Sequence, residues 1–237
     1  MLDFNQVPQE ERIIVAIDCA REEALSIAES LRGKAAWMKV GMTLFYQEGP
    51  SIVAELHERG FKVFLDLKFH DIPHQVRGAA AAAVAAGADM ITMHAVGGAE
   101  MMVAATEGVR SVKADEEPIT LGITVLTSMS QEDLSSTGVE RTVVQQVESL
   151  ARLAKESGLS GVVASPQEAP MLREVLGPEA YIVTPGVRPA GADLGDQTRV
   201  TTPAQAFANG ASHLVIGRPI TAQPDPAAAF DEIVKGL

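Results

Sequence analysis

The stretch IIVAIDCAREEALSIAESLRG, residues 13–33, contains the repeating unit that decides the fold. It opens with a run of apolar, mostly branched residues, 13–17, which favours a buried strand, and continues with a segment of helical period, 22–31. Gly33 follows at a position typical of a helix end. A strand followed by a helix that leads back to a parallel neighbour is the βα unit of an α/β fold.

The same unit recurs along the whole chain. The expected strands are residues 13–17, 37–40, 63–65, 90–93, 121–125, 161–164, 181–184 and 213–216. Expected helices include residues 22–31, 76–86, 99–112, 141–156 and 227–234, and Gly33, Gly87 and Gly158 follow three of them. Eight units averaging about 30 residues, with no long linker, predict a TIM (β/α)8 barrel that spans residues 1–237 as a single domain.

A doubly wound open sheet is the main structural alternative. Its dinucleotide-binding fingerprint, GxGxxG, is absent after the first expected strand, where Asp18-Cys19-Ala20 stands instead. The alanine-rich segment 79–86 needs no functional explanation, because alanine is the best helix former and allows close packing. We therefore expect the barrel.

The composition is that of an acidic protein with one cysteine. Among 237 residues, 31 Asp and Glu exceed 19 Lys and Arg, which gives a formal net charge of -12. This balance argues against nucleic acid as a partner, since such binding needs a basic face, and an anionic ligand must be held by a few placed cations. Cys19 has no disulfide partner, and no apolar run reaches the roughly 20 residues that span a bilayer. We expect a cytoplasmic protein without a membrane partner, with Cys19 as a small apolar filler.

Charged residues stand where several expected strands end. Asp18 follows the first strand, Lys39 lies in the second, and Asp66 and Lys68 close the third. Catalytic groups of parallel barrels lie at this C-terminal end of the strands. Because side chains alternate along a strand, Asp66 and Lys68 are expected to point to the same side. Asp71 follows in the next loop.

Each of these charges has a simpler structural explanation when taken alone. Asp66 with Lys68 suits a structural ion pair, and Asp71 suits an acid near a helix N-terminus. Together they exceed what packing alone would retain, because buried charges are costly. An ammonium about 4 Å from each of two carboxylates gains on the order of 4 kcal/mol per contact at an effective dielectric of about 20, before the cost of desolvation is subtracted. We therefore expect Lys68 to stay protonated and to act as an acid.

The loops after the seventh and eighth expected strands suit a phosphate. They read TPGVR, residues 184–188, and IGRPIT, residues 216–221. TIM barrels frequently bind phosphate at these loops, where glycine allows close backbone approach and arginine offers a planar fork. Turn glycines with solvated arginines are the simpler alternative for either loop alone. Residues 186–197 lack periodicity and suit a lid, while residues 127–138, rich in Ser and Thr, suit either contact with a heterocycle or a polar connection.

Taken together, these segments resemble orotidine 5'-phosphate decarboxylase from Ile14 to Thr221. The most specific part is FLDLKFHDIP, residues 64–73. The supporting motifs are VAID at 15–18, KVG at 39–41, LTSM at 126–129, TPGVRP at 184–189, GDQ at 195–197 and IGRPIT at 216–221.

The resemblance implies decarboxylation of orotidine 5'-phosphate to uridine 5'-phosphate, the last step of de novo pyrimidine nucleotide synthesis. It implies a homodimer that works without a metal or an organic cofactor, and the five histidines form no metal-ligand pattern. The implied catalytic residues are Lys39, Asp66, Lys68 and Asp71, with Asp71 reaching into the neighbouring subunit's site. The implied substrate-binding residues are Asp18 and Lys39 at the ribose, Thr127 at the pyrimidine, Gln197 between base and phosphate, and Arg188, Gly217 and Arg218 at the phosphate.

One departure from the family pattern and two alternative functions remain. The chain has His74-Gln75 where members usually have Asn-Thr, so a threonine contact across the dimer is in doubt. A metal-dependent sugar-phosphate lyase or decarboxylase of the same barrel superfamily, such as hexulose-phosphate synthase, shares the Asp-x-Lys-x-x-Asp series. A non-catalytic nucleotide-binding barrel is the other alternative. The context FHDIP and the GDQ motif favour the nucleotide, and retention of all three charged residues favours catalysis.

Overall fold

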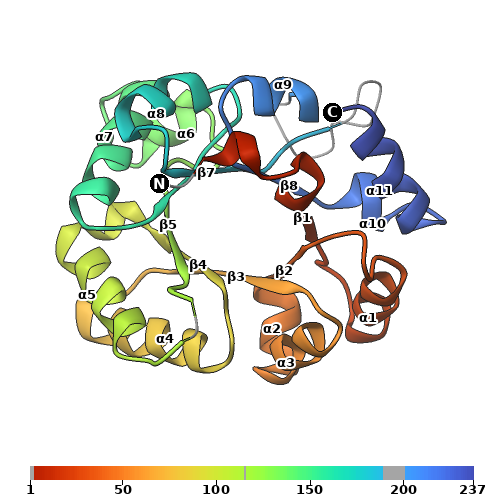
Figure 1. The fold of residues 1–237 in the computed structure, drawn as a ribbon. Coiled ribbons are helices and arrows are strands. Elements are labelled where there is room, and N and C mark those ends of the chain that lie inside the picture. Colours follow the sequence, from red (N-terminus) through yellow and green to blue (C-terminus); the bar gives the residue numbers. More distant parts are fainter. Residues whose placement is uncertain (1–2, 115, 189–200) are drawn as a thin grey trace.

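A ring of parallel strands forms the centre of the molecule (Figure 1). The computed structural model describes residues 3–114, 116–188 and 201–237. Within these ranges the strands pair in sequence order, and the last returns to the first to close the barrel. The strands are β1 Ile13–Ala16, β2 Trp37–Gly41, β3 Lys62–Phe69, β4 Met90–His94, β5 Ile119–Ile123, β6 Gly161–Val163, β7 Tyr181–Thr184 and β8 His213–Ile216. The expected barrel is confirmed, and β3 extends past 63–65 to include Asp66 and Lys68.

Helices surround the barrel on its outer side (Figure 1). They are α1 Arg21–Ser30, α2 Met42–Glu48, α3 Ser51–Glu58, α4 Pro73–Ala85, α5 Ala99–Arg110, α6 Gln131–Ser136, α7 Val143–Glu156, α8 Ala169–Leu176, α9 Pro203–Ala208, α10 Arg218–Thr221 and α11 Pro226–Lys235, with 3-10 turns η1 Phe4–Gln6, η2 Gln9–Arg12 and η3 Ala95–Gly97. Each expected helix is present with ends shifted by a few residues. Residues 127–138 are more than a loop, because Ser130 and Asp133 form a capping box that starts α6.

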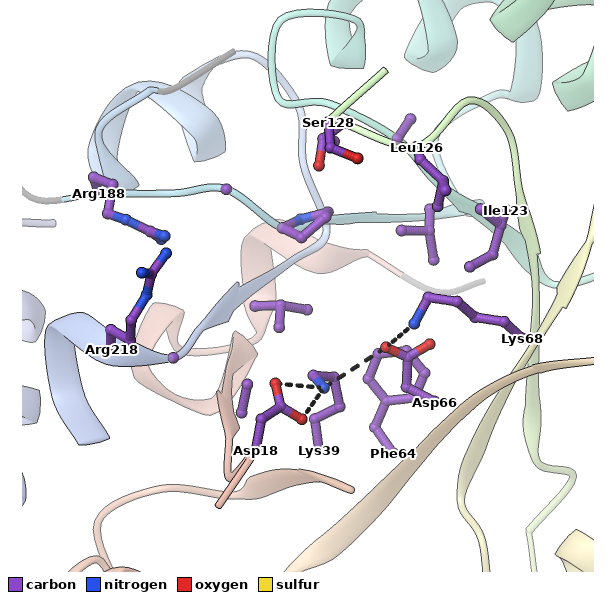
Figure 2. Close-up of a pocket in the computed structure, with 18 of the residues that line it drawn as sticks. Asp18, Lys39, Phe64, Asp66, Lys68, Ile123, Leu126, Ser128, Arg188 and Arg218 are labelled. Atoms are coloured by element: carbon purple, nitrogen blue, oxygen red, sulfur yellow. Dashed lines mark hydrogen bonds and ion pairs between the residues drawn. The ribbon is translucent and has the colours of Figure 1, made fainter. Parts of the chain in front are cut away.

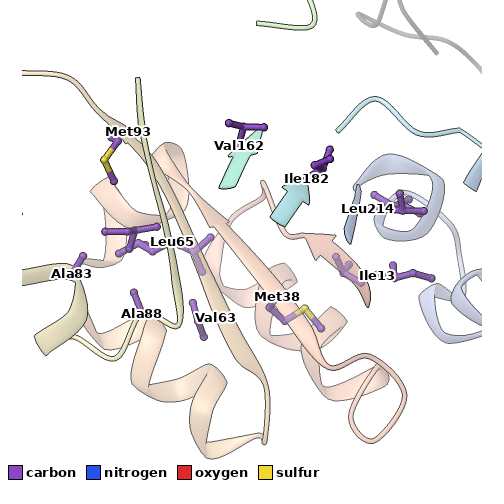
Figure 3. Packing of buried hydrophobic residues seen from close by; sticks show 14 of the residues in the cluster. Ile13, Met38, Val63, Leu65, Ala83, Ala88, Met93, Val162, Ile182 and Leu214 are labelled. Atoms are coloured by element: carbon purple, nitrogen blue, oxygen red, sulfur yellow. The ribbon is translucent and has the colours of Figure 1, made fainter. Parts of the chain in front are cut away.

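Alternating side chains along the strands fill two separate cores. The outer core lies between strands and helices and includes Met38, Val63 and Leu65 (Figure 3). The inner core lies within the barrel and includes Trp37 and Phe64. Since Phe64 points inward and Leu65 outward, the alternation continues as expected and directs the next charged residues of β3 inward.

Aromatic rings occupy the barrel interior where the strands begin. The ring of Phe4 lies 5.1 Å from Tyr181 and 5.9 Å from His213, and Trp37 lies 5.9 Å from His213. Tyr181, His213 and Trp37 are the first residues of β7, β8 and β2. The N-terminal turn η1 therefore packs across this end, where the rings also line a cavity of about 250 Å³.

Close contact between α4 and α5 depends on small residues. A Cβ atom at Gly108 of α5 would overlap the carbonyl oxygen of Arg77 on α4. Ala80 and Ala83 of α4 are buried, which gives the alanine-rich segment its packing role. Among the described helices, none is both long and apolar enough to cross a membrane.

Candidate active site

A cavity of about 600 Å³ opens at the C-terminal ends of the strands. Among the described residues, all those expected from the sequence to bind substrate or carry chemistry line it except Asp71. They are Asp18, Lys39, Asp66, Lys68, Thr127, Arg188, Gly217 and Arg218. Gln197, and with it most of the expected lid, lies outside the described residues. Segments more than 150 residues apart in sequence thus meet around one space, as expected from the barrel.

Four charged side chains form a continuous series along one wall of the cavity (Figure 2). The amine of Lys39 lies 2.9 Å from Oδ1 of Asp18 and 3.7 Å from Oδ2 of Asp66. The amine of Lys68 donates to the same Oδ2 of Asp66 at 2.8 Å. The order Asp18, Lys39, Asp66, Lys68 alternates in sign, so each ammonium is next to at least one carboxylate.

Asp66 is the most enclosed acid of this series. Its side chain is 12% exposed, while that of Lys68 is 27% exposed and reaches further toward the open cavity. Burial raises the pKa of Asp66, but Lys39, Lys68 and a hydrogen bond from Thr92 outweigh burial, so its pKa lies below the ordinary value. Asp66 is therefore a carboxylate at neutral pH and anchors both amines.

The backbone of Lys68 adopts a conformation that side-chain-bearing residues avoid. Its φ of 54° makes it the only non-glycine residue of the described chain in the left-handed region. This conformation costs about 1–2 kcal/mol in an L-residue. The pairing of β3 with β4 shifts between Leu65 and Phe69, so the lysine lies in a bulge. Strain of this kind is concentrated at functional sites, where the surrounding structure must compensate for it.

Two residues that support the charged series were not predicted. Thr92 of β4 bonds both the backbone of Lys68 and the carboxylate of Asp66. Gly41 ends β2 beneath Asp18, and a Cβ atom there would overlap Oδ1 of that carboxylate. The motif KVG includes this glycine, but only the position of Asp18, just after β1, explains why a side chain is excluded there.

Two arginines face the charged series across the cavity. Figure 2 shows Arg188 and Arg218 with their guanidinium groups directed toward a common space. The backbone N–H of Arg188 donates to the carbonyl of Thr201 at 3.0 Å, and its Nη1 donates to the carbonyl of Val187 at 2.9 Å. Arg218 begins α10 directly after Gly217. Lys39, Lys68, Arg188 and Arg218 outnumber Asp18 and Asp66 in the cavity wall, so the site favours an anionic ligand although the protein is acidic.

Asp71 lies outside the cavity of its own chain. It is exposed, and its carboxylate accepts from the backbone N–H of Ile72 at 2.6 Å. Among the described residues it makes no ion pair with Lys68 within 4.0 Å. The side chain of Ile72 beside it is also exposed, at 63%. Within one chain, the expected group of Asp66, Lys68 and Asp71 is therefore incomplete.

Cys19 also lines the cavity but is a weak nucleophile. Burial, together with Glu23 and Asp18, raises the pKa of its thiol to about 11. It packs against the outer core, in agreement with the expected role as a filler. In the part of the chain that the structure describes, no group of three or more His, Cys, Asp and Glu side chains is arranged to hold a metal ion.

Comparison with known proteins identifies the family. The profile described as "Orotidine 5'-phosphate decarboxylase / HUMPS family" matches residues 11–233. The chain belongs to this family. It is 52% identical to the orotidine 5'-phosphate decarboxylase of Moorella thermoacetica over 92% of this chain and 89% of that one. It is 48% identical to the enzyme of the same name from Vibrio atlanticus, over 94% of this chain and 97% of the relative.

Solved structures agree with this assignment. The crystal structure of orotidine 5'-phosphate decarboxylase from Lactobacillus acidophilus superposes with a TM-score of 0.85 at 38% identity, covering 95% of this chain and 98% of that one. An uncharacterised conserved protein from Geobacillus kaustophilus gives a TM-score of 0.83 at 38% identity, covering 93% and 97%. The resemblance seen in the sequence motifs is thus confirmed for the family and for the fold.

Proposed function

We propose that the protein decarboxylates orotidine 5'-phosphate to uridine 5'-phosphate in de novo pyrimidine nucleotide synthesis. The observation that carries the proposal is the series Lys39, Asp66, Lys68, built at the strand ends opposite two arginines in a chain of this family. A nucleotide monophosphate carries its charge at one end and its reacting base at the other. A cavity with arginines on one side and an enclosed lysine on the other suits such a molecule.

Lys68 is the proposed source of both charge stabilisation and the proton. When carbon dioxide leaves C6 of the pyrimidine, the electron pair of the broken bond stays on C6 in an orbital in the ring plane, where the ring delocalises it poorly. A fixed ammonium lowers the energy of this developing carbanion more than water does, because it needs no reorganisation. The Nζ–H bond of Lys68 then breaks as C6 takes the proton, and solvent restores the ammonium.

Asp66 is proposed to hold the Lys68 amine. The hydrogen bond of 2.8 Å from that amine and the enclosed position of the carboxylate support this role. The carboxylate would also lie near the substrate's carboxylate and repel it, but we treat this repulsion as secondary to anchoring. Lys39 is proposed to act twice, as a member of the charged series and, with Asp18, as a ligand of the ribose hydroxyls.

The phosphate is proposed to bind between Arg188 and Arg218, with Gly217 allowing close approach of the backbone. Thr127 is proposed to face the pyrimidine, and Gln197 to bridge base and phosphate. Contacts made far from C6 contribute to the rate as well as to affinity when they stabilise the closed site.

A homodimer is proposed to complete the site, with Asp71 entering the cavity of the partner subunit. Its exposed position outside its own cavity supports this. The elements that follow β2, β3 and β4 also expose large apolar side chains, namely Tyr46 at 74%, Ile72 at 63% and Val96 at 53%. Exposed apolar residues grouped on adjacent elements are typical of an interface. Gln75, which stands where the family pattern has threonine, lies in the first turn of α4.

Subunit mixing tests the shared site. Lys68→Ala and Asp71→Ala homodimers should each be inactive. When the two variants are unfolded, mixed in equal amounts and refolded together, half of the dimers should be mixed, and each mixed dimer contains one intact site. The refolded mixture should therefore regain about a quarter of the wild-type sites. Recovery in the mixture requires that the two residues act across the interface. A mixture as inactive as its components would contradict the shared site.

The activity itself is tested by following the loss of substrate absorbance with orotidine 5'-phosphate in the presence of a chelator. The proposal expects full turnover, because no step passes through a metal. Turnover that appears only after addition of magnesium would instead indicate the metal-dependent sugar-phosphate branch. Stoichiometric binding of uridine 5'-phosphate without any turnover would indicate a nucleotide-binding protein.

We also propose that the chain forms one catalytic domain, since β1 and β8, which are the first and last strands of the barrel, pair directly.

A further inference from the structure

Thr92 occupies a special position opposite the bulge of β3. Leu65 pairs with Ile91 and Phe69 pairs with Met93. Three residues of β3 therefore lie opposite the single residue Thr92 of β4. Regular ladder bonds are lost across such a mismatch, so the backbone groups of the bulge need other partners. Thr92 is fully buried, at 0% exposure, and is directly beside the Lys68 part of the bulge.

The hydroxyl group of Thr92 makes two hydrogen bonds with different polarity. The backbone N–H of Lys68 donates to Oγ1 of Thr92 at 3.0 Å. The same Oγ1 donates its proton to Oδ1 of Asp66 at 2.9 Å. Because an N–H only donates and a carboxylate only accepts, the hydroxyl has one possible arrangement here. It binds the backbone N–H of the strained lysine and one oxygen of the carboxylate at once.

These two bonds fix the orientation of Asp66. With Oδ1 bound to Thr92, the other oxygen, Oδ2, faces the amines of Lys68 at 2.8 Å and Lys39 at 3.7 Å. Rotation of the carboxylate would break the bond from Thr92. The backbone of Lys68 is held at φ 54° by the same hydroxyl. One buried group thus constrains both the starting point of the Lys68 side chain and the carboxylate that receives its amine.

We propose that Thr92 is a positioning residue, which sets the place of the Lys68 amine through the Lys68 backbone and Asp66 without touching the substrate. The inference rests on the proposed function, since it assigns the lysine a catalytic task. Valine has nearly the same shape as threonine but neither donates nor accepts a hydrogen bond. Serine keeps the hydroxyl and loses only a methyl group. The substitutions Thr92→Val and Thr92→Ser therefore separate the effect of the Thr92 hydrogen bonds from the effect of its side-chain volume.

The experiment compares Thr92→Val and Thr92→Ser with the wild type, and uses Thr120→Val as the matched control. Thr120 is a buried threonine of the adjacent strand β5, and its hydroxyl bonds Ser160 away from the cavity. Thr92→Val should lower kcat about 100-fold, because a displacement of about 1 Å at a reacting group costs roughly this factor. KM and the Kd of uridine 5'-phosphate should change less than about threefold, since the ligand contacts remain. Thr92→Ser should recover kcat to within about fivefold of wild type, and Thr120→Val should leave it unchanged.

Several outcomes would overturn the inference. A Thr92→Val enzyme with wild-type kcat, or a Thr92→Ser enzyme as slow as Thr92→Val, would show that the hydroxyl does not position the lysine. An equal loss of nucleotide binding and kcat would indicate general damage to the site. If the wild type itself fails to turn over the substrate, the proposed function fails instead. A crystal structure of Thr92→Val then still decides the positioning role: Lys68 should leave the left-handed conformation or Asp66 should rotate, and an unchanged Lys68 and Asp66 would refute it.

Discussion

The two ends of the barrel interior are built by the same strands and contain opposite kinds of side chain. β2 begins with Trp37 among aromatic rings and two residues later provides Lys39 to the charged series. β3 changes from the buried ring of Phe64 to Asp66 in the same way. At the first end the packed rings stabilise the fold. At the second end charges are buried at a cost in stability, which indicates that they are kept for function.

The comparison also shows how differently burial acts on titrating groups at the two ends. His213, at the aromatic end, has its pKa lowered to about 3, by burial first and then by Arg12 and Lys62. Asp66 is similarly enclosed, yet two lysines and Thr92 outweigh the effect of burial and lower its pKa. The interior at one end therefore favours neutral groups. At the other end, Asp66 keeps its charge because the ammonium groups of Lys39 and Lys68 lie beside it.

The largest expected effect is that of Lys68→Ala at the charged end. Removal of the amine should lower kcat about 10⁴-fold, since both the electrostatic stabilisation and the proton source are lost. The melting temperature should stay within a few degrees of wild type, because the side chain is partly exposed and Lys39 remains beside Asp66. Steady-state kinetics and a thermal melt measure both. A variant that unfolds would mean that the lysine is structural.

Arg218→Ala separates the phosphate side of the cavity from the lysine side. The Kd of uridine 5'-phosphate should rise about 100-fold, because charge-assisted hydrogen bonds to the phosphate are lost, while uridine without a phosphate should bind as before. The matched control is Arg152→Ala on α7, which removes an exposed arginine paired with Glu148. Calorimetric titration of wild type and the two variants with nucleotide and with nucleoside gives the six affinities. Equal weakening of nucleotide and nucleoside binding would place the phosphate elsewhere.

Much of this site was readable from the sequence because its residues stand at strand ends in local patterns. The alternation that puts Asp66 and Lys68 on one side needs only the period of a strand. Thr92 was not predicted, because its contacts depend on the register between β3 and β4. The periodicity of a single segment does not determine the register between two strands. α6 was missed although its capping residues, Ser130 and Asp133, were a local signal that could have revealed it.

At the aromatic end, Phe4→Ala should change stability without changing catalysis. The ring is 7% exposed and packs edge-on against Tyr181, so its loss should cost about 2 kcal/mol, less than a central core phenylalanine because η1 is short. This corresponds to a fall in melting temperature of about 4–8 °C for a chain of this size. kcat should equal that of wild type. A large loss of kcat at unchanged stability would show that the two ends are coupled.

Over a single pH unit, the smallest expected effect is a pH dependence of stability that arises from His213. As pH falls below about 6.5, the unfolded chain binds a proton on this histidine, while the folded chain does so only near pH 3, so folding stability is lost between these values. The limiting slope is about 1.4 kcal/mol per pH unit. Denaturant titrations at several pH values should give a shallower slope for His213→Phe. The contribution of His94, whose pKa is also lowered by burial, cancels in this comparison. Parallel slopes would mean that folding does not lower the pKa of His213.

Proton exchange at C6 of uridine 5'-phosphate in deuterated water tests the central claim most directly. The exchange is the proton-transfer step alone, without loss of carbon dioxide, and nuclear magnetic resonance follows it at one atom. We predict that the wild type exchanges the C6 proton and that Lys68→Ala, saturated with the same nucleotide, does not. Exchange by the variant at the wild-type rate would contradict the role given to the lysine.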